Sequence, residues 1–161
     1  MIVVNVGKII MNLGKILLFI TFFNISSFLY SDDSIWLTDF ELAKQQSEKK
    51  HLPILVNFTG SDWCPYCKKL ENEVFSKPEF LNYVKENFVI LKIDFPQNHK
   101  LAGKILKIHK KLAEKYKVKE FPAVVFLDKN GEFILKTGYR DGGVQSYISF
   151  LKIVKKIAVS L

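Results

Sequence analysis

The sequence predicts an α/β domain in which a βαβ unit is joined by a helix to a β-hairpin and a closing helix. Segments with strand-like and helical hydrophobic periodicity alternate along the chain. Asn130-Gly131, between two apolar runs, is a strong hairpin signal. The chain has 161 residues, 48% of them hydrophobic and 25% charged, which suits one globular domain with a substantial core.

The first 31 residues differ in composition from the rest. They carry Lys8 and Lys15, no acidic residue, and an apolar centre around Ile16–Ile20. This pattern is typical of a secretory signal peptide, so we expect cleavage after Ser31 and export of a domain over residues 32–161 to the periplasm. The alternative is an uncleaved inner-membrane anchor, although polar residues interrupt the apolar stretch. Disulfides form and persist in an exported compartment.

The first half of the domain should supply the βαβ unit. Thr38 and Glu41 match a capping box, with Thr38 as the N-cap of the first helix. The helix between the two strands implies that they are parallel. The expected elements are a helix to about Lys49, a strand over Ile54–Phe58, a helix from Cys64 or Pro65 through Val74, a helix over Glu79–Asn87 and a strand over Phe88–Phe95.

The second half should supply a helix, the hairpin and a closing helix. The expected elements are a helix over Lys100–Lys117, strands over Ala123–Leu127 and Glu132–Thr137, a loop over Gly138–Gly143 and a helix from Val144. Helical spacing directs one set of apolar residues of the two helices inward: Leu101, Ile105, Ile108, Leu112 and Tyr116, then Val144, Tyr147, Ile148, Leu151, Val154, Ile157 and Ala158.

The only two cysteines of the chain, Cys64 and Cys67, lie where the first strand gives way to a helix. Two cysteines at this spacing can close a small disulfide and reopen it. Helix N–H groups and the helix dipole favour the thiolate of the first cysteine, and the thiolate is the form that attacks disulfides. The pattern therefore indicates redox chemistry on sulfur.

Other interpretations of the cysteine pair are less favourable. A structural disulfide would close a very small loop and stabilise little. A metal site needs about four ligands and would have to recruit His99 or His109 from a distant helix. Buried inert thiols do not suit a pair followed by Pro65 and Lys68, which mark an exposed helix start. An enzyme with a Cys–His nucleophile is also conceivable, but that chemistry would not explain a second cysteine at the spacing of Cys67.

Three segments resemble the thioredoxin-like superfamily: Ile54–Phe58 leading into Trp63-Cys64-Pro65-Tyr66-Cys67, Lys117–Ala123, and Asp128–Gly131 followed by Gly138. The resemblance covers about Trp36 to Val159 and implies the thioredoxin fold, a four-stranded mixed sheet flanked by helices. The residues around the cysteines look more like the exported bacterial thiol:disulfide interchange proteins than cytosolic thioredoxin. The tetrapeptide Cys-Pro-Tyr-Cys also occurs in glutaredoxins, which lack this Trp-Cys context.

The resemblance implies roles for individual residues. Cys64, at the helix start, should be the more exposed sulfur and would attack a substrate disulfide. Cys67, one turn deeper, would resolve the mixed disulfide. Pro122 would follow a cis peptide bond that exposes the backbone of Phe121 to an extended substrate, unless it is an ordinary proline that begins an edge strand. The residues expected to bind substrate are Trp63, Pro65, Tyr66, Phe121 and Pro122.

The sequence departs from the family at one position. Thioredoxin has a buried aspartate on its central strand that helps to deprotonate the second cysteine, and Asn57 stands there in this chain. An asparagine cannot take a proton. Water or another carboxylate must then serve Cys67, and Asp62, Glu71 and Glu73 are close to it in sequence.

The formal net charge is +8, with a denser run of lysines over residues 104–119. Such a helix face could meet nucleic acid or anionic lipid, but it is more often a solvated face, and we expect no nucleic-acid partner.

We expect a monomeric thiol:disulfide oxidoreductase that acts on protein disulfides without a bound cofactor or metal and is recharged by a membrane or soluble redox partner. Tyr66 brings no positive charge to the pair, which favours a reductase or isomerase over an oxidase. The alternative is a thioredoxin-fold binding module, either for Cu(I) or for exported chains, without redox turnover.

Overall fold

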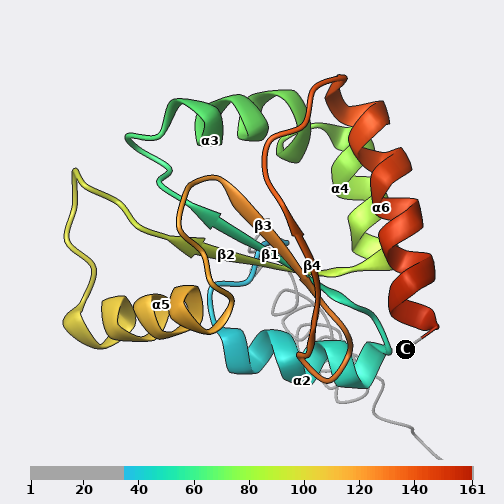
Figure 1. Cartoon of the computed structure of the whole chain (residues 1–161), viewed down its shortest axis with the longest axis horizontal. Helices are drawn as coiled ribbons and strands as arrows, with labels where there is room; N and C mark the ends of the chain where they lie inside the picture. Colours follow the sequence, from blue (N-terminus) through green and yellow to red (C-terminus); the bar gives the residue numbers. More distant parts are fainter. Residues whose placement is uncertain (1–34, 161) are drawn as a thin grey trace, which may run out of the picture. The chain divides into compact units, whose positions relative to one another are not determined.

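The computed structural model describes residues 35–160, and the predicted signal segment lies outside them. The described chain forms a four-stranded sheet in the order β2-β1-β3-β4 (Figure 1). β1 (Ile54–Thr59) pairs in parallel with β2 (Val89–Asp94) and antiparallel with β3 (Ala123–Leu127). β3 pairs antiparallel with β4 (Phe133–Thr137). The sheet is mixed and the βαβ unit is parallel, which confirms both predictions.

Helices cover both faces of the sheet (Figure 1). On one face lie α3 (Pro65–Leu70), which continues directly into the π-helix η1 (Glu71–Phe75), then α4 (Pro78–Asn87) and α6 (Gly143–Val159). On the other face lie α2 (Phe40–Lys50) and α5 (Gly103–Lys115). No helix within residues 35–160 is both long and apolar enough to cross a membrane.

Each face of the sheet has its own hydrophobic core because side chains alternate along a strand. Leu55 and Val124 point toward the aromatic residues of η1, α4 and α6, among them Phe75, Phe80 and Tyr147. The alternate positions of the same strands pack against α2 and α5, with contacts to Ala43, Leu112 and Tyr116. β1 is buried along its whole length, as expected of a central strand.

Three details of the helices differ from prediction. The N-cap of α2 is Asp39, because its carboxylate accepts the Leu42 N–H at 3.0 Å, and Thr38 lies before the cap. α5 begins at Gly103 and its buried stripe runs through His109 and Leu112. The predicted inward residues that prove exposed are Ile105 and Ile108 of α5 and Ile157 of α6, which lie off the buried stripes of their helices.

Candidate active site

The two cysteines lie beyond the carboxyl end of β1 and form a disulfide, with 5.2 Å between their Cα atoms. Cys64 is the N-cap of α3: its backbone is extended and its Sγ accepts the Cys67 N–H at 3.2 Å. Pro65 occupies the first helical turn, where its missing N–H leaves no bond unmade. The Cys67 Sγ accepts the Gly60 N–H at 3.5 Å. Backbone donors therefore face both sulfurs.

Pro122 comes to the disulfide from a distant part of the chain. The Phe121–Pro122 peptide bond is cis, which confirms the expectation for this proline. The Phe121 carbonyl oxygen lies 3.6 Å from the Cys64 Sγ. Pro122 is buried and Phe121 is half-buried. An extended chain that reaches Cys64 would thus meet the backbone of Phe121 first.

One expectation about the cysteines is wrong for this disulfide form. Cys64 was expected to be the more exposed of the two, yet both residues are only 4% exposed. The segment that carries Phe121 and Pro122 packs against Cys64 and covers it. This contact joins residues 57 positions apart, so the local sequence around the pair does not report it.

Trp63 lies at the rim of the disulfide and is 39% exposed. Its indole Nε1 donates to the Phe95 carbonyl at 2.7 Å, and its ring meets the Phe121 ring edge-on with centroids 5.9 Å apart. The indole also passes over Gly60 so closely that a Cβ there would overlap the ring. Trp63 is therefore held by three contacts while part of its ring faces solvent.

Tyr66 forms the opposite side of the rim and is 60% exposed. Its ring lies 6.0 Å from that of Tyr139, in the loop before α6. The Tyr139 hydroxyl donates to Glu73 at 2.6 Å, and this bond raises the pKa of Tyr139. The Lys69 ammonium lies 4.6 Å from the centre of the Tyr139 ring, and its bond to Tyr139 raises the pKa of Lys69.

A small recess opens beside Cys67. It has a volume of about 350 Å³, and Cys67, Thr59, Glu71 and Lys92 are among the residues that line it. Glu71 Oε2 lies 4.0 Å from Lys92 Nζ, and neither side chain is fully buried. Lys92 stands next to Asn57 in the β1–β2 register, and the buried Asn57 Oδ1 has no hydrogen-bond partner within the described part of the chain.

The two other candidate carboxylates face elsewhere. The Asp62 carboxylate accepts the N–H groups of Gln97 and Asn98, at 3.1 and 2.7 Å. These bonds, that of Asn98 first, lower the pKa of Asp62. Glu73 is engaged by Tyr139. Of the three acidic residues singled out from the sequence, the structure thus places only Glu71 in the recess that Cys67 lines.

The end of β2 also contributes to the site, through Asp94 and the following Phe95, which the sequence motifs did not predict. Phe95 stacks on Phe121 with ring centroids 5.1 Å apart, and Asp94 accepts hydrogen bonds from both the N–H and the hydroxyl of Ser61. The order of the predicted elements could have indicated this contribution. The carboxyl ends of parallel strands lie at the same edge of a sheet, so the residues that end β2 lie beside the cysteines that follow β1. The buried His109 contacts the same segment, with Nδ1 2.8 Å from the Asp94 carbonyl oxygen.

The histidines do not complete a metal site with the cysteines. Across residues 35–160, no three His, Cys, Asp or Glu side chains form a group that could hold a metal ion. His51 caps the end of α2, before the amino end of β1, whereas the disulfide lies beyond the carboxyl end of that strand. His99 is exposed in the loop before α5.

Known proteins resemble this chain in sequence and in fold. The disulfide bond reductase DsbH of Chlamydia pneumoniae is 32% identical over 115 residues, which are 71% of this chain and 69% of that protein. The thioredoxin-related protein DsbJ of the same organism is 32% identical over 108 residues, 67% of this chain but 31% of DsbJ. A solved structure of the DsbH oxidoreductase superposes with a TM-score of 0.71 at 31% identity and covers 75% of this chain and 83% of that one. The model of the thioredoxin-like domain matches residues 40–148, and with these relatives it establishes that the chain belongs to the thioredoxin-like family and is homologous to bacterial thiol:disulfide proteins.

Proposed function

We propose that this chain is an exported thiol:disulfide oxidoreductase that reduces disulfides in protein substrates. The observation that carries the proposal is the Cys64–Cys67 disulfide at the start of α3, with the Phe121 carbonyl 3.6 Å from the first sulfur. A reductase leaves its own cysteines in this oxidised state after each turnover. The similarity to DsbH, whose name describes a disulfide bond reductase, supports this direction of electron flow.

In the reduced protein, Cys64 is the attacking thiolate. The Cys67 N–H, which donates to the Cys64 sulfur in the disulfide, favours the negative charge. The Cys64 thiolate attacks one sulfur of the substrate disulfide, that S–S bond breaks, and the other substrate sulfur leaves as a thiolate that takes up a proton. The product is a mixed disulfide between Cys64 and the substrate.

Cys67 then resolves the mixed disulfide. It loses its proton and attacks the Cys64 sulfur, the bond to the substrate breaks, and the second substrate thiol is released. Two electrons have passed to the substrate and Cys64–Cys67 is oxidised. A dithiol partner protein must supply two electrons to restore the pair, by the same steps in reverse.

We assign Glu71 as the group that accepts the proton of Cys67. It lines the same recess as Cys67, which is open to water, and its Oε2 lies 4.0 Å from the Lys92 Nζ. Asn57, the nearest counterpart of the aspartate that thioredoxin uses, cannot accept a proton. Glu71 would act through water in the recess as a general base for the resolving step.

We assign substrate contact to the rim of the disulfide. Trp63 and Tyr66 offer exposed aromatic surface on the two sides of Cys64, next to the exposed Pro65. The cis Phe121–Pro122 segment offers backbone groups to an extended chain, a mode in which main-chain hydrogen bonds supply affinity with little demand on sequence.

Reduction of insulin by residues 32–161 in the presence of dithiothreitol tests the proposal. Cys64→Ser should abolish the catalysed rate. In a separate incubation of the pre-reduced protein with insulin and no dithiothreitol, Cys67→Ser should accumulate a mixed disulfide that survives denaturation and is released by added reductant. An unchanged insulin rate in Cys64→Ser would refute the enzymatic function. A reduction potential well below the −120 mV or so of strong oxidants would support a reductase, whereas a value near it would refute this direction.

Export is tested separately by the N-terminus of the protein recovered from its native cells. Mass spectrometry should find Asp32 as the first residue and the protein outside the cytoplasm. Recovery of the intact N-terminus in a membrane fraction would instead indicate an anchor, and recovery in the cytoplasm would refute export.

A further inference from the structure

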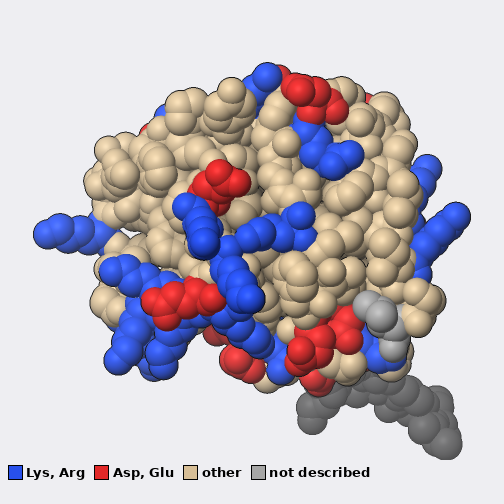
Figure 2. Space-filling model, in the orientation of Figure 1, with Lys and Arg blue, Asp and Glu red and all other residues tan. Residues whose placement is uncertain are grey.

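The positive charge of the domain is concentrated in one segment. Residues 100–122 contain eight lysines and two glutamates, whereas the remainder of residues 32–161 contains fourteen basic and fourteen acidic residues. The excess of positive charge therefore comes from this segment alone. It comprises α5 and the loop that leads to Pro122, and Figure 2 shows basic side chains gathered over α5 at the lower left of the view.

The same segment forms one wall of a groove with a volume of about 450 Å³. The apolar part of the groove includes Phe95, Val118 and Phe121. Three lysines border it, Lys110, Lys117 and Lys119, together with one acidic residue, Glu114. An apolar floor with a basic rim differs from an ordinary solvated helix face, which presents charged side chains without a hollow between them.

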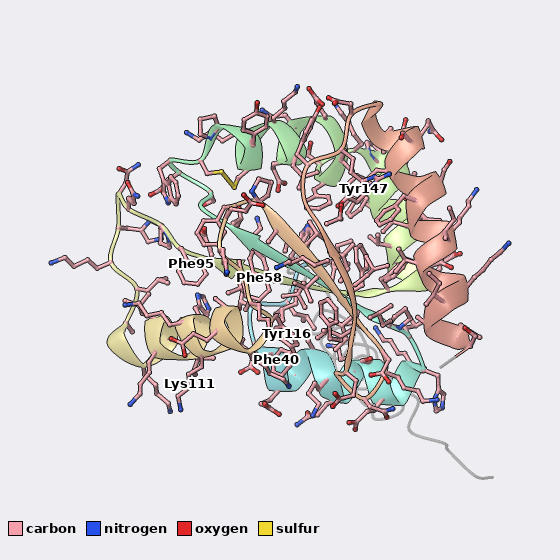
Figure 3. All side chains as sticks on the ribbon, viewed as in Figure 1. Phe40, Phe58, Phe95, Lys111, Tyr116 and Tyr147 are labelled. Atoms are coloured by element: carbon pink, nitrogen blue, oxygen red, sulfur yellow. A yellow bond between two sulfur atoms is a disulfide. The ribbon has the colours of Figure 1, made fainter. Side chains whose placement is uncertain are left out.

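The groove runs up to the disulfide. Phe121 carries an aromatic ring and is one of the residues that line the groove, and its carbonyl oxygen lies 3.6 Å from the Cys64 Sγ. Phe95 stacks on that ring and accepts the indole N–H of Trp63. In Figure 3, Phe95 lies between the yellow disulfide bond and α5. A polypeptide whose cysteine reaches Cys64 can therefore continue along Phe121 and Phe95 toward the lysines.

We propose that this groove binds an acidic, extended stretch of the substrate polypeptide beside its disulfide. An apolar side chain of the substrate packs on Phe95 and Phe121, and carboxylates next to it lie among Lys110, Lys117 and Lys119. The complementary charge speeds the encounter and selects acidic over basic sequences. This inference rests on the proposed reductase function and adds the substrate class to it.

The test compares two short peptides, each with one cysteine in a mixed disulfide with mercaptoethanol and a phenylalanine beside it. One peptide is flanked by four glutamates and the other by four lysines. The reduced protein is mixed with each peptide at low and at high salt. Lys110→Glu with Lys119→Glu is the test variant. Lys152→Glu with Lys156→Glu, two exposed positions of α6 on the other face of the sheet, changes the net charge equally and is the matched control.

We expect the wild type to reduce the acidic peptide about tenfold faster than the basic one at low salt, with a much smaller ratio at 0.5 M salt. The test variant should bring the ratio close to one, and the control should keep most of it. A wild-type ratio near one, or equal effects of the two double variants, would overturn the proposal.

A third substrate separates this result from the proposed function. Bis(2-hydroxyethyl) disulfide is uncharged and too small to reach the groove, so its reduction reports the thiol chemistry alone. Peptide rates are divided by this rate for each variant. If the wild type fails to reduce the small disulfide, the reductase function is wrong; if it reduces it but does not discriminate between the peptides, only the groove assignment is wrong.

Discussion

Glu71 lies one helical turn after Cys67 and shares a recess with it, and its Oε2 is 4.0 Å from the Lys92 Nζ. A carboxylate, an ammonium and the resolving cysteine thus border one opening to solvent. The carboxylate comes from η1 and the ammonium from β2, so that strand pairing and the helix start together create the recess. The proposed proton acceptor thus lies outside the central strand β1, which carries no carboxylate.

We expect Glu71→Gln to slow the resolving step by about tenfold near pH 7, less than the usual 10²–10⁴-fold effect of a general base, because water in the recess can take over part of the role. Rapid mixing of reduced protein with a disulfide peptide separates the attack of Cys64 from resolution by Cys67. The mixed disulfide should accumulate in the variant, and its decay should become faster as the pH rises. The attack itself should keep its rate.

Glu79→Gln is the control for this experiment, because Glu79 is exposed in the first turn of α4 and carries the same charge. Equal decay of the mixed disulfide in Glu71→Gln and wild type would contradict the role of Glu71. Slower attack by Cys64, without slower resolution, would contradict it as well.

Asp62 links the cysteine loop to the loop after β2, and its lowered pKa makes this link dependent on pH. A carboxyl whose pKa is lower in the folded protein than the ordinary 3.8 stabilises the fold above that pH, and the contribution is lost as the pH falls through the folded-state value. Asp62→Asn should therefore lower the melting temperature by a few degrees at pH 7. The difference between the two proteins should shrink as the pH falls below 3.8 and be smallest at the acid end of the range.

Thermal unfolding followed by circular dichroism from pH 7 to pH 2.5 measures this effect. Asp141→Asn, at an exposed aspartate in the loop before α6, serves as the control and should leave the melting temperature unchanged across the range. A constant difference between Asp62→Asn and wild type at all pH values would show that the charge of Asp62 is not what matters.

Much of the domain follows from local sequence. Hydrophobic periodicity predicts the ends of each strand to within about one residue of their observed positions. Pro65 and Pro78 mark helix starts because proline suits a first helical turn. The cysteine pair is also a local signal. The contacts that complete the site are not local: Trp63 with Phe95, Cys64 with Phe121, and Glu71 with Lys92 join segments that only the packing of the sheet and helices brings together.

Two kinds of error have physical causes. Ile105 and Ile108 were predicted to be buried because they are apolar and helically spaced, but the stripe of α5 that faces the sheet begins at His109. A hydrophobic pattern does not predict a buried histidine, because histidine is polar. His109 can be buried because its Nδ1 lies next to the Asp94 carbonyl oxygen. The π-helix over Glu71–Phe75 was read as ordinary helix because its wider turn leaves no periodic signature in five residues.

Gly60 is required by the indole of Trp63. A Cβ at Gly60 would overlap the indole ring, so Gly60→Ala should displace Trp63 from the Phe95 carbonyl and destabilise the domain by about 1–3 kcal/mol. Tryptophan fluorescence and the insulin rate should both change. Gly103→Ala is the matched control: nothing lies within 4 Å of its Cβ position, in the first turn of α5, so stability should be kept or rise by up to about 1 kcal/mol. Equal behaviour of the two alanine variants would refute this role of Gly60.

Tyr147 is fully buried among the aromatic residues of the core formed with η1, α4 and α6. Its hydroxyl has no hydrogen-bond partner within residues 35–160. Burial raises its pKa, so the hydroxyl stays neutral over the working pH range. Removing a buried polar group that lacks a partner takes away a desolvation cost, so Tyr147→Phe should leave stability unchanged or raise it by about 1 kcal/mol.

Tyr116 provides the contrast for Tyr147→Phe, because its buried hydroxyl donates to the Gly131 carbonyl at 3.3 Å. Burial raises the pKa of Tyr116 to about 12, so this donor also stays protonated. Tyr116→Phe leaves that carbonyl without its donor and should cost about 1 kcal/mol. Urea unfolding of both variants measures the difference. If Tyr147→Phe loses as much stability as Tyr116→Phe, the Tyr147 hydroxyl must have a partner, such as a buried water, and its place in the core has to be explained by that bond.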